Sequence, residues 1–189
     1  MTLQSPSNLS NQFLIAMPQL DDPNFQHTTT YICEHNQDGA MGLIINRPMN
    51  LHVDEVLEQM DIKVIDKQLA NTPVFHGGPV QEERGFVLHK PATLWESTVV
   101  ISNQLAITTS KDILEEIAKG QGPSQYLITL GYAGWGFGQL ELEIAENTWL
   151  NGPADLSVIF DEPVENRWNK AAMTIGVDLN LLSSDMGHA

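Results

Sequence analysis

The stretch Gly131-Tyr-Ala-Gly-Trp-Gly-Phe-Gly-Gln-Leu-Glu-Leu-Glu-Ile144 is the most unusual part of the sequence. Four glycines are interleaved with three aromatic residues in its first half, and an acidic amphipathic segment follows directly. Glycine permits positive φ and close backbone approach, while Tyr132, Trp135 and Phe137 carry large apolar surfaces. We therefore predict that this run forms a fixed, tightly packed turn.

The segments that flank this run have their own periodicity. Residues 126–132 are strongly apolar and predict a strand that enters the turn. After the turn, Leu140 and Ile144 share one face of a helix, although the alternation of Leu140, Leu142 and Ile144 also fits a strand. We favour the helix, because glutamine and glutamate are good helix formers and acidic residues suit a helix N-terminus.

The rest of the chain mixes short strands and helices without a regular β-α-β repeat. A turn at residues 36–39, which contains Asp-Gly, joins two of the strands into a hairpin. This intermingling predicts an α+β fold with a mixed or bent sheet. Strands are expected at residues 13–17, 28–33, 41–46, 74–76, 86–89, 98–102 and 105–108, and helices at residues 52–60, 111–119 and 163–173.

The length of 189 residues suits one domain, which we place at residues 11–182. Polar tails at residues 1–10 and 183–189 are expected to be flexible. The chain carries 9 Lys and Arg against 24 Asp and Glu, which gives a formal charge of -15. Because nucleic-acid affinity depends on cations that neutralise phosphates, direct nucleic-acid binding is disfavoured.

Cysteine usage and hydropathy bear on the compartment. Cys33 is the only cysteine, so no intramolecular disulfide forms, which suits a reducing cytosol. The first residues lack the basic and apolar regions of a secretory leader, and no apolar run reaches the ~18 residues of a membrane span. We expect a cytoplasmic monomer that does not associate with membranes.

Several segments together resemble one family of bacterial proteins, the AlgH/YqgE-like family. They are spread over residues 13–176, and their combination is specific although each alone is not. The segments are Phe13–Pro18, Cys33–Pro48, His76–Val80, Arg84–His89 and Gly131–Trp135.

The resemblance implies a single α+β domain with a bent, barrel-like mixed sheet flanked by helices. The family has no agreed catalytic residues, cofactor or substrate, so the resemblance carries none of these to the chain. One branch is named for an effect on the transcription of an exopolysaccharide pathway, which suggests a regulatory role but identifies no direct DNA contact.

Cys33 and His35 form the first candidate site. They lie two residues apart, so on an extended strand both side chains face the same side, where the imidazole lowers the thiol pKa and favours thiolate. The alternative is that Cys33 is a small core residue and His35 begins the turn. A reactive thiol would indicate a redox sensor that uses an external thiol or sulfenic acid chemistry.

The second candidate site is the segment from His76 to Arg84, which offers backbone N–H groups, an imidazole and a permanent cation. These groups suit a small anion or a nucleotide phosphate, although the spacing matches neither standard nucleotide-binding motif. The alternative is a sharp turn in which Arg84 pairs with Glu82 or Glu83. With the end of the first hairpin, the predicted anion-binding residues are His76, Gly77, Gly78, Arg84, Asn46 and Arg47.

The glycine-aromatic run is the third candidate site. Its residues Tyr132, Trp135, Phe137 and Gln139 form either a docking surface for a protein or ligand, or a packing corner that sets the entry of the following helix.

Motifs for hydrolysis and metal binding are weak. His89, Asp112 and Ser110 are the residue types of a hydrolase triad, but the chain has no Gly-x-Ser-x-Gly elbow. The six histidines include neither an HxH nor an HExxH pattern. We expect no metal and no cofactor.

Two functions follow from these patterns. We favour a non-enzymatic regulatory or adaptor protein that acts through protein or small-ligand binding, with any influence on transcription being indirect. The alternative is an enzyme that binds a small anion or nucleotide, or a thiol redox sensor, with an unassigned reaction.

Overall fold

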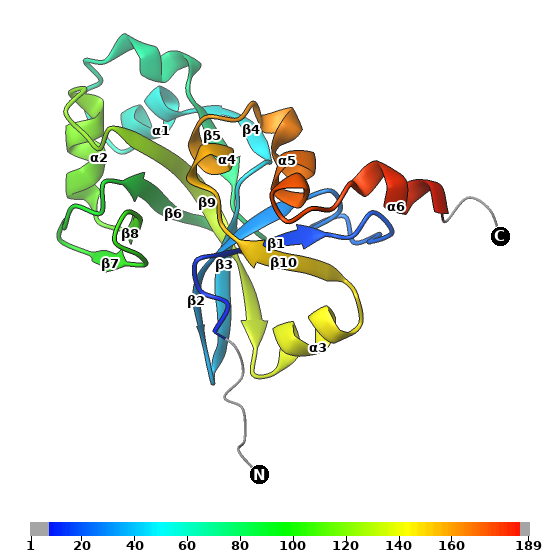
Figure 1. Ribbon diagram of the computed structural model, residues 1–189. Coiled ribbons are helices and arrows are strands. Elements are labelled where there is room, and N and C mark those ends of the chain that lie inside the picture. The colour runs from blue at the N-terminus through cyan, green and yellow to red at the C-terminus, as the bar shows by residue number, and fades with distance from the viewer. Residues whose placement is uncertain (1–7, 186–189) are drawn as a thin grey trace.

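Strand β9 (Gln125–Gly136) runs through the centre of a single curled sheet in the computed structural model, which describes residues 8–185 (Figure 1). Its first half pairs with β6 (Val80–Lys90) and its second half with β3 (Gly39–Ile44), both antiparallel. The glycine-aromatic run therefore lies in the strand that joins the two halves of the sheet.

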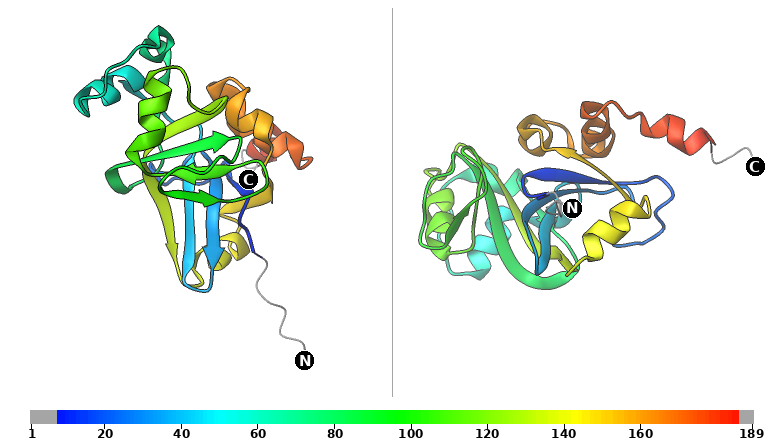
Figure 2. Two further views of the ribbon diagram at one scale, coloured as in Figure 1. Left: turned by 90° about the vertical axis from the view of Figure 1, so that its left-hand side faces the viewer. Right: turned by 60° about the horizontal axis from the view of Figure 1, so that its bottom comes forward.

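The strand order along the main path of the sheet is β10-β1-β2-β3-β9-β6-β8-β7. Two further strands, β4 and β5, pair with each other, and β5 runs parallel to β9, so the sheet is mixed as predicted. Figure 2 shows how strongly the sheet curls into a half-barrel. The remaining strands are β1 (Gln12–Ala16), β2 (Thr29–Asn36), β4 (Pro48–His52), β5 (Pro73–His76), β7 (Thr98–Val100), β8 (Ala106–Thr108) and β10 (Trp149–Pro153).

Helices cover both faces of this sheet (Figures 1 and 2). They are α1 (Val53–Gln59), α2 (Lys111–Ala118), α3 (Gln139–Ala145), α4 (Leu156–Phe160), α5 (Arg167–Thr174) and α6 (Leu179–Asp185), with short 3-10 helices at Lys67–Asn71 and Val164–Asn166. None of the helices in residues 8–185 combines the length and the hydropathy that crossing a membrane requires.

The two faces of the sheet have separate hydrophobic cores. On the inner face, side chains such as Leu127 pack with α4, α5 and α6. On the outer face, α1 and α2 pack over one end, where Ile128 lies, and α3 packs over the other end, where Trp135 lies. The sheet thus sits between two layers, and the predicted α+β class with a bent, barrel-like sheet is confirmed.

A bulge at Gly131 keeps the two halves of β9 consistent with these cores. Leu127 and Tyr132 both pack on the inner face although they are five residues apart, which uninterrupted alternation does not allow. Gly131, which has φ +76°, is the residue at which this alternation breaks. On β6 the pairing is irregular at the same place, because residues 81–84 lie between Val80, which pairs with Tyr132, and Gly85, which pairs with Leu130.

The predicted turn at residues 131–138 is wrong in extent. The strand continues to Gly136, and only Phe137 and Gly138 turn before α3 begins. Close contact between strands explains Gly131 of this run, where a Cβ would lie 2.4 Å from the Gly78 carbonyl oxygen, and Gly39 of β3, where a Cβ would lie 2.0 Å from the Trp135 carbonyl oxygen. A Cβ on Gly134, Gly136 or Gly138 would meet nothing closer than 3.4 Å. Pairing between distant segments therefore outweighs the low strand propensity of glycine.

Most other local predictions agree with the structure. The β2–β3 hairpin and the helices α1, α2, α3 and α5 lie where the pattern placed them, and β7 and β8 match the strands expected at residues 98–102 and 105–108. The elements β4, β10, α4 and α6 were not predicted. The ordered region extends beyond the predicted boundaries, because Leu9 is buried and α6 continues to Asp185. The rest of the two predicted tails lies outside the described residues.

Replacing Gly78 should destabilise the fold. Its φ is +153°, and a Cβ there would lie 2.1 Å from the Tyr132 carbonyl carbon. We expect Gly78→Ala to lower the free energy of unfolding by about 3 kcal/mol. The matched control is Gly85→Ala, whose Cβ would meet only Leu130 at 3.9 Å and should change the value by less than about 0.5 kcal/mol. Urea unfolding measures both, and equal effects would contradict the steric argument.

Candidate ligand-binding cleft

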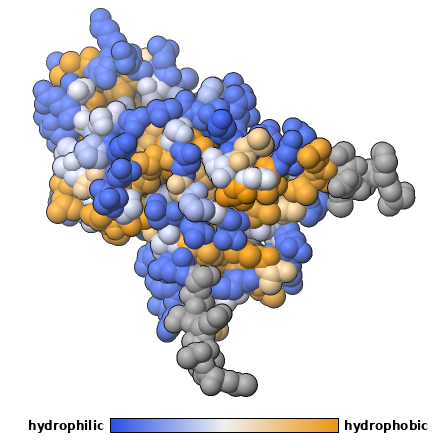
Figure 3. Space-filling view, in the orientation of Figure 1, coloured by the Kyte–Doolittle hydropathy of each residue, from blue (hydrophilic) through white to orange (hydrophobic). Residues whose placement is uncertain are grey.

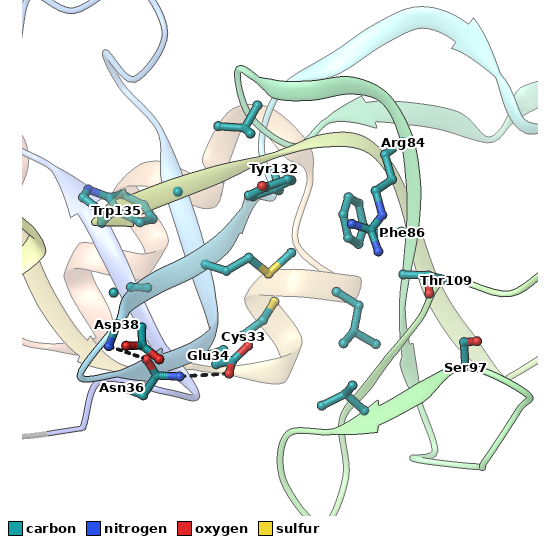
Figure 4. Close-up of a pocket in the computed structure, with 17 residues that line it drawn as sticks. Cys33, Glu34, Asn36, Asp38, Arg84, Phe86, Ser97, Thr109, Tyr132 and Trp135 are labelled. Carbon is teal, nitrogen blue, oxygen red and sulfur yellow. Dashed lines mark hydrogen bonds between the residues drawn. The ribbon is translucent and has the colours of Figure 1, made fainter. Parts of the chain in front are cut away.

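An open cleft of about 730 Å³ lies on the inner face of the sheet (Figure 4). The β2–β3 hairpin forms one wall, β6, β7 and β8 form the other, and β9 lies between them. Alternate residues of a strand face the cleft, as the period of two requires; Arg84 and Phe86 on β6 are an example. The apolar part of the lining comes from Cys33, Met41, Phe86, Val99, Ile107 and Tyr132.

Arg84 is the only cation lining this cleft in the part of the chain that the structure describes. Its guanidinium carbon lies 5.2 Å from the centroid of the Phe86 ring, and Phe86 packs edge-on against Tyr132 with the centroids 5.7 Å apart. Among residues 8–185 no carboxylate forms an ion pair with Arg84. Its charge is therefore available to a ligand, and the predicted alternative of a pair with Glu82 or Glu83 is not found.

Cys33 lies on β2 in the hairpin wall of the cleft and is buried. Burial raises the pKa of its thiol well above the ordinary range, and the nearby carboxylate of Glu34 adds to this effect. The Sγ atom contacts the Tyr31 carbonyl oxygen at 3.8 Å. The surroundings of Cys33 thus favour the neutral thiol.

His35 does not share a face with Cys33, and that prediction is wrong. The pairing of β2 with β3 shifts register between Ile32 and Glu34, so Cys33 and Glu34 both face the cleft. His35 turns to the outer face instead. Its Nδ1 accepts the Leu9 N–H at 3.0 Å, and its Nε2 lies 2.5 Å from a carboxylate oxygen of Glu141.

The glycines of the predicted anion site are used in packing. Gly77 donates its N–H to the Leu130 carbonyl at 2.8 Å, and a Cβ on Gly77 would lie 2.4 Å from the Gly131 carbonyl oxygen. His76 lies beside Glu82, with 3.1 Å between Nε2 and Oε1. Arg84 is thus the one predicted anion-binding residue that lines the cleft.

Asn46 and Arg47 hold a neighbouring turn. Asn46 accepts the Thr29 N–H at 2.9 Å and donates to the His27 carbonyl at 2.9 Å. Arg47 donates to the carbonyls of Asn24 and Gln26 at 2.7 and 3.0 Å, and burial lowers its pKa. These two residues therefore stabilise a turn and do not line the cleft with Arg84.

The aromatic residues of the glycine run divide between packing and exposure. Trp135 is 6% exposed and forms a cluster with Phe25 and Trp149, with ring centroids 6.1 Å from each. Both indole N–H groups donate to one oxygen of Glu143, at 2.7 Å from Trp135 and 3.1 Å from Trp149. Trp135 therefore serves mainly as a packing residue, although it also borders the cleft.

The other residues of this run have different surroundings. Tyr132 lines the cleft and packs against the inner core. Phe137 is 84% exposed at the turn before α3. The Gln139 side chain accepts the Gly136 N–H at 3.0 Å, which secures the start of the helix. Only Tyr132 and Phe137 remain as candidates for binding a partner.

The three residue types of a hydrolase triad do not form a triad, because His89 is hydrogen-bonded to neither Ser110 nor Asp112. The Ser110 hydroxyl donates to Asp112 at 2.6 Å, at the start of α2. His89 is buried and pairs with the Thr108 hydroxyl at 2.7 Å and the Pro91 carbonyl at 2.9 Å. Burial lowers the pKa of His89, which keeps the imidazole neutral.

The acidic and much of the apolar lining of the cleft comes from residues that were not predicted as site residues. Glu34 and Asp38 come from the hairpin, and Val99 comes from a short edge strand. The β-branched residues of 98–102 indicated a strand, but local pattern does not show which surface that strand faces. No group of three or more His, Cys, Asp or Glu side chains suited to a metal ion is found within residues 8–185.

Comparison with known proteins places the chain in a family. A family model described as AlgH-like matches residues 13–180. The chain belongs to the AlgH-like family. A UPF0301 protein of Thioalkalivibrio sulfidiphilus is 57% identical over 99% of this chain and 100% of its own length. A UPF0301 protein of Methylococcus capsulatus is 56% identical over 95% of this chain and 96% of its own length.

Solved structures of similar fold agree with this AlgH-like assignment. The solution structure of the AlgH protein from Pseudomonas aeruginosa has a TM-score of 0.80 and 49% identity, with 100% of both chains covered. A crystal structure from Corynebacterium diphtheriae has a TM-score of 0.76 at 19% identity, covering 96% of this chain and 94% of that one, and shows the fold alone. The resemblance seen in the sequence is confirmed.

Glu143 should be needed to stabilise the two buried indoles of this AlgH-like protein. Glu143→Ala leaves both N–H groups without an acceptor, and we expect a loss of about 2 kcal/mol in the free energy of unfolding. Glu143→Gln keeps an amide oxygen and should lose about half as much. Urea unfolding followed by tryptophan fluorescence measures both variants. An unchanged Glu143→Ala midpoint would contradict the bridging role.

The thiol of Cys33 should react slowly in the native protein. Because burial raises its pKa, we expect alkylation by iodoacetamide at neutral pH to be at least about tenfold slower than for a model thiol. In urea the rate should rise to the model value. His35→Gln should leave the native rate unchanged, since the imidazole faces away. Labelling faster than the model thiol would contradict the burial argument.

Proposed function

We propose that this AlgH-like chain is a non-enzymatic regulatory or adaptor protein that binds a protein or small ligand in the inner cleft. The observation that carries the proposal is the guanidinium of Arg84, which forms no ion pair with a carboxylate among residues 8–185 and lies over the Phe86 ring at the side of the cleft. Arginine, tyrosine and methionine are enriched at interfaces, because they combine large contact area with specific geometry. The cleft offers all three in Arg84, Tyr132 and Met41.

The surroundings of the cysteine, histidine and serine candidates favour a binding role over a catalytic one. Nucleophilic catalysis requires a nucleophile and a base within hydrogen-bond reach. Cys33 has a raised thiol pKa, His89 is held by Thr108, and Ser110 is engaged at the start of α2. None of these arrangements pairs an activated nucleophile with a base.

The strongly acidic composition supports an indirect route to any effect on transcription. A chain of net charge -15 repels nucleic acid on average, and the cleft itself contributes the carboxylates of Glu34 and Asp38 as well as Arg84. A regulatory effect would therefore pass through a partner in the cytoplasm, where we place the protein. The monomer is the expected binding unit.

A second candidate function is an enzyme that binds a small anion, and the free charge of Arg84 is what favours it. A phosphate or carboxylate would form charge-assisted hydrogen bonds with the guanidinium. The apolar lining would then contact the body of the same ligand. The reaction has no assignment, because among the described residues that line the cleft no nucleophile is hydrogen-bonded to a base.

A thermal-shift panel of nucleotides, sugar phosphates and small carboxylates tests the small-ligand form. A ligand that binds the native state raises the melting temperature by mass action. We expect Arg84→Gln to weaken any such ligand by about tenfold to a hundredfold, the value of a hydrogen bond to a charged group. Lys63→Gln is the matched control, because it makes the same charge change at an exposed residue outside the cleft.

The outcomes separate the two forms of the proposal. A shift that disappears in Arg84→Gln and persists in Lys63→Gln supports a small anionic ligand in the cleft. Turnover of that ligand would favour the enzyme. A flat panel would contradict the small-ligand form and leave a protein partner.

A further inference from the structure

Strand β7 is the last strand at one edge of the sheet, and within residues 8–185 β8 is the only strand that pairs with it. The Thr109 N–H donates to the Ser97 carbonyl at 3.0 Å, and the Ile101 N–H donates to the Leu105 carbonyl at 2.9 Å. Backbone groups alternate in direction along an antiparallel strand, so those of Val99 also face β8. The N–H and C=O groups of Thr98 and Val100 therefore point away from β8 to the open edge.

This edge carries exposed apolar side chains beside the cleft. Val99 is 62% exposed and lines the cleft, and Val100 is 50% exposed. Figure 3 shows hydrophobic residues gathered at the side of the molecule where β7 and β8 lie. An edge strand with unpaired backbone groups and apolar side chains is a template for another strand.

The charges of the cleft are separated across its width. Arg84 extends from β6 on one side, while Glu34 and Asp38 extend from the β2–β3 hairpin on the other (Figure 4). Met41 and Phe86 provide apolar surface in the lining between β2 and β8. A ligand that complements this surface has an anionic group, an apolar middle and a cationic group in line.

We propose that an extended peptide segment of a partner protein adds as a strand to the free edge of β7. Its alternate side chains enter the cleft, with an acidic one at Arg84, apolar ones against Met41 and Phe86, and a basic one near Glu34 and Asp38. Backbone pairing supplies affinity and the cleft supplies sequence preference, as in other strand additions. The inference rests on the proposed binding role of the cleft and names the chemistry of the partner.

A library of random nonapeptides displayed on phage, selected on the whole protein, provides the probe. The enriched peptides should show β-branched residues, with an acidic and a basic residue at opposite ends of one alternating face. Synthetic copies of these peptides, labelled with fluorescein, then give dissociation constants by fluorescence polarisation. A failure to enrich any peptide above an unrelated acidic protein would overturn the inference.

Val100→Pro is the decisive variant, because it removes an N–H that faces the open edge and leaves the bonds of Val99 to β8 in place. We expect the peptide to bind about tenfold more weakly or worse, because the variant loses one hydrogen bond to the peptide and the proline ring hinders the approach of the added strand. Val100→Ala is the matched control, because it trims the side chain and keeps the N–H. It should bind within about threefold of the wild type. Circular dichroism checks that both variants fold.

Hydrogen exchange followed by NMR tests the same contact without a substitution. Bound peptide should protect the amides of Thr98 and Val100, whereas the Val99 amide is already bonded to β8 and should change little. Protection of all three amides equally, or of none, would contradict strand addition.

The responses of the enriched peptides distinguish failure of this inference from failure of the proposed function. Binding lost in both Val100→Pro and Arg84→Gln supports strand addition into the cleft. Binding lost in Arg84→Gln alone would overturn strand addition while the cleft remains a binding site. Binding that both variants retain would overturn the peptide inference and count against the cleft as the binding site.

Discussion

The segment between β5 and β6 crosses β9 so closely that the two backbones leave no room for a side chain between them. A Cβ on Gly131 would lie 2.4 Å from the Gly78 carbonyl oxygen, and one on Gly77 would lie 2.4 Å from the Gly131 carbonyl oxygen. Such contacts permit only glycine. They hold the bulge of β9 at the point where its pairing changes from β6 to β3, and bulges add twist and bend to a sheet. The curl of the half-barrel depends on this crossing.

The same bulges decide which side chains face the cleft. The bulge of β9 turns Tyr132 to the inner face, and the irregular pairing of β6 next to it leads into Arg84 and Phe86. On β2, a further shift of register turns Glu34 toward the cleft and His35 away from it. Three departures from regular pairing thus produce one surface that combines a cation, acidic groups and apolar side chains.

Three arginines differ in what their guanidinium groups contact. Arg47 bonds to the carbonyls of a turn, and the buried Arg167 bonds to the Ile45 and Glu162 carbonyls and lies 5.3 Å from the Phe75 ring. Burial lowers the pKa of both groups, although their backbone partners keep them in place. Arg84 is exposed and contacts the Phe86 ring. The composition of the chain does not distinguish the roles of these three arginines.

Local pattern by itself determined most of the strands, the hairpin that turns at residues 36–39, helices such as α2 and α3, and the family. Periodicity, turn residues and motif combinations are properties of neighbouring residues. Only the tertiary structure decided that the Gly131 run is a bulged strand, that Cys33 and His35 lie on opposite faces, and that Trp135 packs under α3. Those outcomes depend on strands distant in the chain approaching within backbone contact. A one-residue bulge moves every later side chain of a strand to the opposite face of the sheet. The alternation of residues in the sequence does not show where such a bulge occurs.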